Sequence, residues 1–171
     1  MCIRDRDLIA GLPQDTVESF AKTIDGVLAL DPENITVHTL ALKRSSNITQ
    51  SGRFNTKTAP AGEMLRYASA SLLRAGYEPY YLYRQSRMVG NLENTGWSRP
   101  GFENCYNIYI MDETHTILAC GAGAVSKIKQ PGGNRLERIF NFKFPYEYIS
   151  RHAEMMSRKD QVKMLYDQFS Q

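Results

Sequence analysis

Apolar and polar positions in the first 42 residues follow a strand–helix–strand pattern. Residues 7–13, with the sequence DLIAGLP, begin as an apolar strand and end in a sharp turn. Apolar side chains then recur at the spacing of one helical face over residues 17–30. Residues 35–42 alternate as a second strand does. A helix between two strands makes a β-α-β unit, so the two strands are predicted to run parallel.

The ends of this predicted helix have their own signals. Asp15 is the predicted N-cap, with Glu18 three residues later to complete a capping box. Asp31 precedes Pro32, and a residue before proline avoids helical angles. The helix is therefore predicted to end near Leu30.

The middle of the chain predicts a loop, a helix, a strand and a second loop. Residues 45–60 are polar, and a loop of this length is often functional. Residues 62–75 have an apolar helical face, and residues 77–86 form an aromatic-rich strand. Residues 88–102 are rich in glycine and asparagine and predict a loop that carries the single tryptophan, Trp97.

The last third of the chain predicts short antiparallel strands and a final helix. The strands are expected at residues 106–111, 116–120, 125–129 and 135–142, with PGGN at 131–134 as the clearest turn. Cys105 and Cys120 would then lie on facing strands as buried free thiols. A C-terminal helix is predicted from Pro145, with a break near residues 157–160.

These elements predict an α/β fold whose first strand has no neighbour on one side. A parallel strand needs partners, and only six residues precede Asp7. We therefore expect the chain to begin in the middle of a domain. Residues 1–6, MCIRDR, fit poorly with the strand that follows and are predicted to be a non-native junction.

Composition and charge argue against several classes of function. The chain has 171 residues, of which 42% are hydrophobic and 23% charged, as in a globular protein. No run approaches the length of a membrane span, and no secretory signal is visible. The net charge of +3 is scattered, which argues against a nucleic-acid partner. Three cysteines without a paired framework favour a reducing, cytoplasmic compartment.

Asp7 is the first candidate for a binding role. Asp7 and Ile9 point to the same side of their strand, and an acidic residue inside a parallel strand is unusual. Its carboxylate could accept hydrogen bonds from the hydroxyls or the amine of a ligand, or it could simply be a polar strand start. Gly11 lies at the carboxyl end of this strand, where α/β folds place ligands, although an ordinary strand–helix turn also explains it.

Other sequence motifs do not indicate a functional site. The segment GAGAVS at 121–126 lacks the third glycine and the following helix of a dinucleotide site. The three histidines have no metal spacing and are interpreted as structural or surface residues. No nucleophile motif is present, so no catalytic residue is assigned.

Several of these segments, taken in order, carry a resemblance to a known family. The first group is DLIAGLP at 7–13, VESF at 17–20 and LDP at 30–32. The second group is GYE at 76–78, YYLYRQ at 80–85, RPG at 99–101, Asn107 and GAGAVS at 121–126. Together they resemble the oxygen-independent coproporphyrinogen III oxidase family of radical S-adenosylmethionine enzymes. Residues 83–97 and FNFKFP at 140–145 are most similar to its coproporphyrinogen dehydrogenase branch.

The resemblance implies a fold, a reaction and cofactors. Residues 7–60 would be the end of a partial (β/α) barrel, and residues 61–171 a small α+β domain with antiparallel hairpins and a C-terminal helix that covers the substrate. The family uses S-adenosylmethionine and an iron–sulfur cluster of the 4Fe-4S type, reduced by an electron donor. The implied reaction is oxidative decarboxylation of coproporphyrinogen III, a tetrapyrrole, to protoporphyrinogen IX in haem biosynthesis.

The resemblance also implies cofactor-binding residues. By position, Asp7, Ile9 and Ala41 match residues of the family that contact S-adenosylmethionine. Ile128 matches a position that touches a second such molecule in some members. No residue of this chain is implied as a metal ligand.

One departure from the family is clear. The cluster needs cysteines spaced C-x-x-x-C-x-x-C, and no such triplet exists in this sequence. We expect that triplet upstream of Asp7, so the chain resembles the C-terminal part of the enzyme and is predicted to be inactive alone. Two alternatives remain open at this point: a haem-binding carrier of the same superfamily, and a generic α/β interaction domain.

Overall fold

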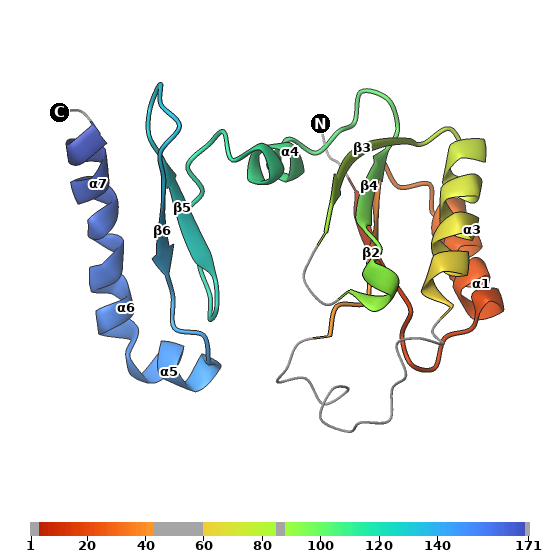
Figure 1. Cartoon of the computed structure of the whole chain (residues 1–171), viewed down its shortest axis with the longest axis horizontal. Coiled ribbons are helices and arrows are strands. Elements are labelled where there is room, and N and C mark those ends of the chain that lie inside the picture. Colours follow the sequence, from red (N-terminus) through yellow and green to blue (C-terminus); the bar gives the residue numbers. More distant parts are fainter. Residues whose placement is uncertain (1–3, 43–59, 85–87, 170–171) are drawn as a thin grey trace. The chain divides into compact units, whose positions relative to one another are not determined.

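The computed structural model describes residues 4–42, 60–84 and 88–169. These residues belong to two compact units, Met1–Cys105 and Tyr106–Gln171, which are described separately (Figure 1). The predicted loop at residues 45–60 lies almost wholly outside the described residues. None of the helices in the described part of the chain is both long and apolar enough to cross a membrane.

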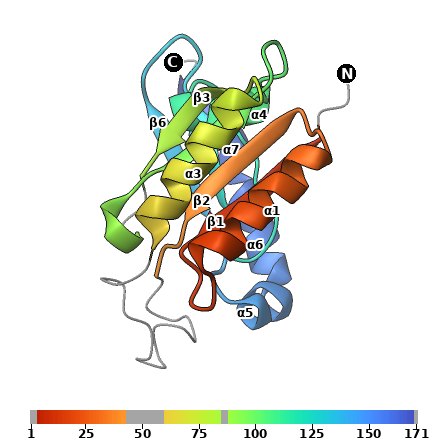
Figure 2. The ribbon, with the colours of Figure 1, turned by 90° about the vertical axis from the view of Figure 1, so that its right-hand side faces the viewer.

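The first unit is built on a four-stranded sheet with the order β1-β2-β4-β3. Figure 2 labels β1, β2 and β3 of this sheet. Its strands are β1 (Asp5–Ala10), β2 (Asn34–Thr39), β3 (Glu78–Tyr83) and β4 (Asn94–Ser98). β1 and β2 are parallel, and β4 is antiparallel to both of its neighbours. The predicted β-α-β unit is therefore confirmed. Its first strand begins at Asp5, inside the segment that fitted poorly with a strand.

Two helices, α1 (Val17–Ala29) and α3 (Ala61–Arg74), cover one face of this sheet (Figure 1). The apolar side chains of both helices meet those of β2 in a core made of Ala10, Phe20, Ile24, Ile35, Val37, Met64, Ala68, Leu72, Tyr77 and Trp97. Ile35 and Val37 alternate with Thr36 and His38 along β2, so the opposite face of the sheet is more polar. The candidate site lies on that polar face.

The cap of α1 differs from the prediction. Thr16, not Asp15, is the N-cap, and its hydroxyl accepts a hydrogen bond from the backbone N–H of Ser19 at 3.1 Å. The Ser19 hydroxyl in turn accepts from the Thr16 N–H at 3.0 Å. Serine thus replaces the usual glutamate of a capping box. The backbone N–H of Asp15 instead closes a turn onto the carbonyl of Leu12.

The prediction of a loop at residues 88–102 was wrong for residues 94–98. Residues Asn94–Ser98 form β4 between β2 and β3, and Trp97 is only 5% exposed in the core. A short 3-10 helix, η1 (Val89–Asn91), precedes this strand. Asparagine and glycine suggested a loop, but Asn94 bonds the end of β2 and Gly96 makes room for the ring of Tyr81.

The second unit begins with a helix where a strand was predicted. α4 (Cys105–Asp112) replaces the strand at 106–111, and residues 116–120 contribute only an isolated bridge between Ile117 and Lys127. Cys105 and Cys120 are therefore not on facing strands. Both thiols are free and exposed, which corrects the expectation that they are buried.

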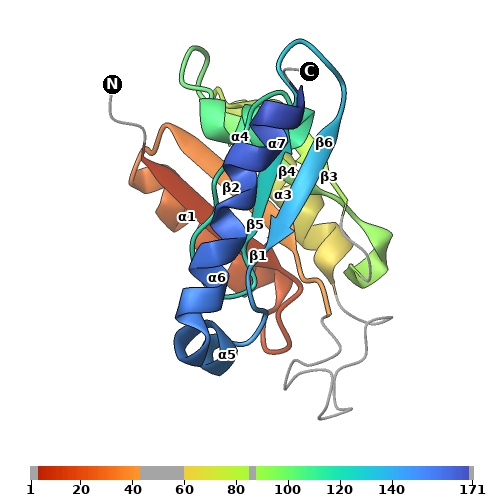
Figure 3. The same ribbon diagram turned by 90° about the vertical axis from the view of Figure 1, so that its left-hand side faces the viewer.

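The rest of the second unit follows the predictions. β5 (Val125–Lys129) and β6 (Leu136–Phe140) form the expected antiparallel hairpin. Three short helices follow it, α5 (Pro145–Ser150), α6 (His152–Lys159) and α7 (Gln161–Phe169), as seen in Figure 3. The predicted break is confirmed at Asp160, and a further break occurs at Arg151.

Candidate functional site

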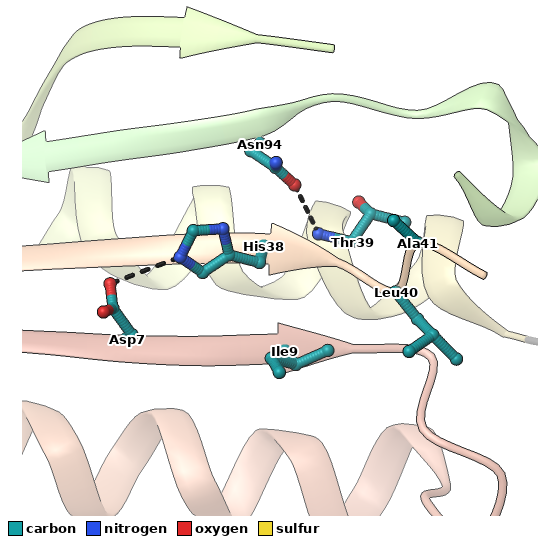
Figure 4. Close-up of a pocket in the computed structure, with 7 residues that line it drawn as sticks. All are labelled: Asp7, Ile9, His38, Thr39, Leu40, Ala41 and Asn94. Atoms are coloured by element: carbon teal, nitrogen blue, oxygen red, sulfur yellow. Dashed lines mark hydrogen bonds and ion pairs between the residues drawn. The ribbon is translucent and has the colours of Figure 1, made fainter. Parts of the chain in front are cut away.

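A cavity of about 410 Å³ opens where the parallel strands β1 and β2 end (Figure 4). Its walls come from β1, from β2 and the two residues that follow it, and from the first residue of β4. The lining residues are Asp7, Ile9, His38, Thr39, Leu40, Ala41 and Asn94. We call this cavity the strand-end pocket. Such an edge is where open α/β sheets bind their ligands.

The register of β1 and β2 explains how the pocket forms. Ile9 lies opposite His38, and Asp7 lies two residues before Ile9 on the same face. Beyond Ala10, Gly11 turns the chain away with φ +88°, a conformation that favours glycine. A Cβ on Gly11 would stand 3.1 Å from the Cβ of Ala61, so the turn also packs tightly against the start of α3.

A chain of polar contacts crosses three strands at the edge of this pocket. Nε2 of His38 lies 3.3 Å from Oδ1 of Asp7, and Nδ1 of His38 lies 3.4 Å from the hydroxyl of Tyr83. The rings of His38 and Tyr83 meet edge to face. The side chain of Asp7 is 70% exposed and that of His38 is 28% exposed, so a ligand could reach the carboxylate directly.

Asn94 secures the other side of the pocket. It is buried, and its side-chain oxygen accepts a 2.7 Å hydrogen bond from the backbone N–H of Thr39. The Thr39 hydroxyl donates to the carbonyl of Glu93 at 3.1 Å. These bonds hold Thr39, the last residue of β2, in place where the regular backbone hydrogen bonds of the sheet end. The sequence prediction missed Asn94 because asparagine among glycines was taken as a loop signal.

Further along the same face, Tyr81 lies across the sheet toward Thr36. The two hydroxyls are 2.9 Å apart. Burial raises the pKa of Tyr81 to about 12, so its phenol keeps its proton at physiological pH. The pair of hydroxyl groups beside the pocket is therefore polar but uncharged.

The structure brings three of the four predicted cofactor-binding residues together. Asp7, Ile9 and Ala41 all line the strand-end pocket, and Ile9 is 43% exposed, which is unusual for a large apolar side chain. Ile128 lies in the second unit, on β5, where its side chain is fully buried. In the described residues no group of three or more His, Cys, Asp or Glu could hold a metal ion.

The second unit has a separate cavity of about 400 Å³. Its lining is mostly apolar and consists of Leu118, Ala119, Cys120, Tyr148, His152, Met155, Met156, Lys159 and Val162. The ammonium of Lys159 donates to the Ala119 carbonyl at 3.0 Å and to the Ser126 hydroxyl at 2.7 Å. Burial lowers the pKa of Lys159, since the charged form is poorly solvated there.

The fold and the strand-end pocket define a class: an α/β protein with a cavity at the carboxyl ends of two parallel strands. No protein-family model matches the chain. No solved structure matches it either.

Two curated relatives do match. The chain is 40% identical over 156 residues to the oxygen-independent coproporphyrinogen-III oxidase-like protein HemZ of Bacillus subtilis (strain 168), covering 90% of this chain and 31% of that protein. It is 39% identical over 75 residues to the oxygen-independent coproporphyrinogen III oxidase of Pseudomonas aeruginosa, covering 42% of this chain and 16% of that protein. The resemblance carried by the sequence is thus confirmed. The chain is similar to part of each of these two relatives, and it spans less than a third of the length of either one.

Proposed function

We propose that this chain is part of a radical S-adenosylmethionine enzyme that oxidatively decarboxylates coproporphyrinogen III to protoporphyrinogen IX in haem biosynthesis. The observation that carries the proposal is the meeting of Asp7, Ile9 and Ala41 in the strand-end pocket. These are the positions that the family resemblance assigns to cofactor contact. Residues 7–60 of the first unit would then be the end of a partial (β/α) barrel.

The residues of the pocket suit S-adenosylmethionine. The exposed Asp7 carboxylate can accept hydrogen bonds from ribose hydroxyls or from the ammonium group. Ile9, Leu40 and Ala41 offer an apolar surface for a flat base. When bound, the cofactor supplies the radical that abstracts hydrogen from the propionate side chains of the substrate. The chain's own contribution is to orient the cofactor.

The iron–sulfur cluster has no ligand set in this sequence, because no C-x-x-x-C-x-x-C triplet is present. We therefore expect the cluster ligands, and the contact with an electron donor, in another part of the intact protein. Residues 61–171 are proposed to cover the tetrapyrrole substrate, and the protein is proposed to act in the cytoplasm. This chain alone is expected to turn over neither cofactor nor substrate.

A segment exchange tests the proposal. The matching part of the Bacillus subtilis relative is replaced by this chain, and product formation is followed anaerobically with coproporphyrinogen III. We expect the chimera to form protoporphyrinogen, and a D7A chimera to lose most of that activity because the carboxylate contact is gone. An active parent with a folded, cluster-loaded but inactive chimera would contradict the proposal.

The cavity of the second unit favours one second candidate, haem binding. It combines an apolar wall with His152, and a neutral imidazole is a common axial ligand of haem iron. Tight haem binding by the chimera without product, lost in an H152A variant, would favour a carrier over an oxidase. Unchanged spectra of haem in the presence of the protein would eliminate this candidate.

A further inference from the structure

We propose that His38 is a positioning residue of the strand-end pocket, which fixes the Asp7 carboxylate for ligand binding through a directed chain of hydrogen bonds from Tyr83 to His38 to Asp7. The inference rests on the proposed function, because it names how the cofactor contact at Asp7 is held in place. Nothing in the family resemblance assigned a role to His38. The sequence had placed it among structural or surface histidines.

The direction of the chain follows from the chemistry of its two ends. An ionised carboxylate can only accept, so Nε2 of His38, 3.3 Å from Oδ1 of Asp7, must carry a proton to bond it. In the neutral ring Nδ1 is then the acceptor, and the Tyr83 hydroxyl, 3.4 Å away, is the donor that faces it. The opposite tautomer would set the lone pair of Nε2 against the negative charge of Asp7. With a neutral His38 ring, the chain therefore runs from the phenol to the carboxylate.

This arrangement leaves part of Asp7 available. His38 engages Oδ1, and within the described residues Oδ2 accepts no hydrogen bond. The carboxylate sits on a strand with 70% of its side chain exposed, and an exposed carboxylate would otherwise turn freely. A ligand that bonds Asp7 would then have to immobilise it first. Because His38 already holds the carboxylate in place, the free energy of ligand binding no longer includes the cost of ordering it.

A rigid support stands behind the imidazole. Tyr83 lies on β3 and Asp7 on β1, at the two outer strands of the sheet, while His38 lies on β2 and is only 28% exposed. The ring of Tyr83 also stacks on Tyr81, whose hydroxyl is paired with Thr36. The orientation of His38 is thus fixed by side chains on both sides rather than by solvent.

The first test reads the tautomer of His38 in the folded chain from the ring nitrogen chemical shifts of a 15N-labelled sample. We expect the Nε2–H form of the neutral ring to dominate, and both Y83F and D7A to weaken this preference. His115 and His152 lie in the second unit and are internal controls whose signals should not change. A mixed tautomer that is the same in the native chain and in Y83F would overturn the proposal.

The second test measures binding of S-adenosylmethionine to the same chain by calorimetry. H38F keeps an aromatic ring but cannot donate, and we expect it to bind roughly tenfold more weakly, as befits a lost hydrogen bond to a charged group. H38Q can still donate to Asp7 and should bind within about threefold of the native chain. Thermal melts of both variants establish that the first unit remains folded.

The outcomes separate the two proposals. If H38F binds S-adenosylmethionine as tightly as the native chain does, the proposed role of His38 is overturned. The proposed cofactor site is not affected by that result. If H38F and H38Q weaken this binding equally, the proposed role is also overturned. The cause would then be the changed shape of the side chain and not the lost hydrogen-bond donor. Failure of the native chain to bind S-adenosylmethionine counts against the proposed cofactor site in this chain, and the tautomer measurement then decides the role of His38 by itself.

Discussion

The ring of Tyr81 lies so close over Gly96, its partner on the neighbouring strand, that a Cβ on Gly96 would stand 1.9 Å from Cε1 of Tyr81. The register shift between Pro79 and Tyr81 occurs just before this pair. Because Gly96 has no side chain, the phenol can cross β4 and reach the hydroxyl of Thr36 on β2. One glycine inside a strand thus allows an aromatic side chain to bridge three strands beside the pocket.

A G96A substitution should destabilise the first unit. The added methyl group overlaps the Tyr81 ring, so the ring must leave its place, and overpacking of this kind costs about 1–3 kcal/mol. Urea unfolding followed by the fluorescence of Trp97, the only tryptophan, measures the free energy of unfolding of this unit. The double variant G96A/Y81A should lose less than the sum of the two single changes. Strict additivity would show that the two residues do not compete for space.

The protonation of Tyr81 should appear in the alkaline stability of the chain. The pKa of Tyr81 is about 12 in the folded state against an ordinary 10.0, because burial disfavours the phenolate. The unfolded chain therefore loses this proton first as the pH rises. Between the two values the folded state holds more protons, so the free energy of unfolding falls with increasing pH. Below pH 10 this contribution is fully present.

A Y81F variant provides the control for that titration. It cannot form a phenolate, so the decline that Tyr81 causes between about pH 10 and 12 should be absent from its stability profile. Tyr77 titrates in both proteins, and the difference between the two profiles isolates Tyr81. Parallel profiles across this range would contradict the buried, protonated state of Tyr81.

The start of α1 distinguishes the observed cap from the one predicted from sequence. T16A removes the hydroxyl that accepts from the Ser19 N–H and should cost about 1 kcal/mol of stability. D15A removes only a 3.3 Å bond from the Ser19 hydroxyl and a favourable charge near the helix end, so it should cost less than half as much. The same urea experiment measures both variants. A larger loss of stability in D15A than in T16A would indicate that Asp15 is the N-cap.

The first half of the fold followed from periodicity. An apolar helical stripe between two short strands has few other solutions, so the parallel pairing of β1 and β2 and the inward faces of α1 and α3 were predicted correctly. The alternation of Asp7 and Ile9 also predicted that both would face one side. These are local patterns, and local patterns are what a single sequence records best.

The errors arose where distant contacts decide the structure. Asn94 and Gly96 disfavour a strand locally, but Asn94 bonds the end of β2 and Gly96 makes room for Tyr81. Residues 106–111 were predicted as a strand but belong to α4. None of the residues of α4 is buried, so its apolar residues carry no information about a core. The contact between His38 and Asp7 required the register of two strands, which the sequence does not state.

The central claim is that the strand-end pocket binds S-adenosylmethionine, and a pair of matched substitutions tests it most directly. A41L fills the pocket, whereas A29L makes the same change at an exposed position near the end of α1. Calorimetric titration of the native chain and both variants with S-adenosylmethionine gives the three affinities. We expect A41L to bind at least about tenfold more weakly, a loss of about 1.4 kcal/mol, and A29L to match the native chain. Equal binding by A41L and A29L would place the cofactor elsewhere and contradict the account.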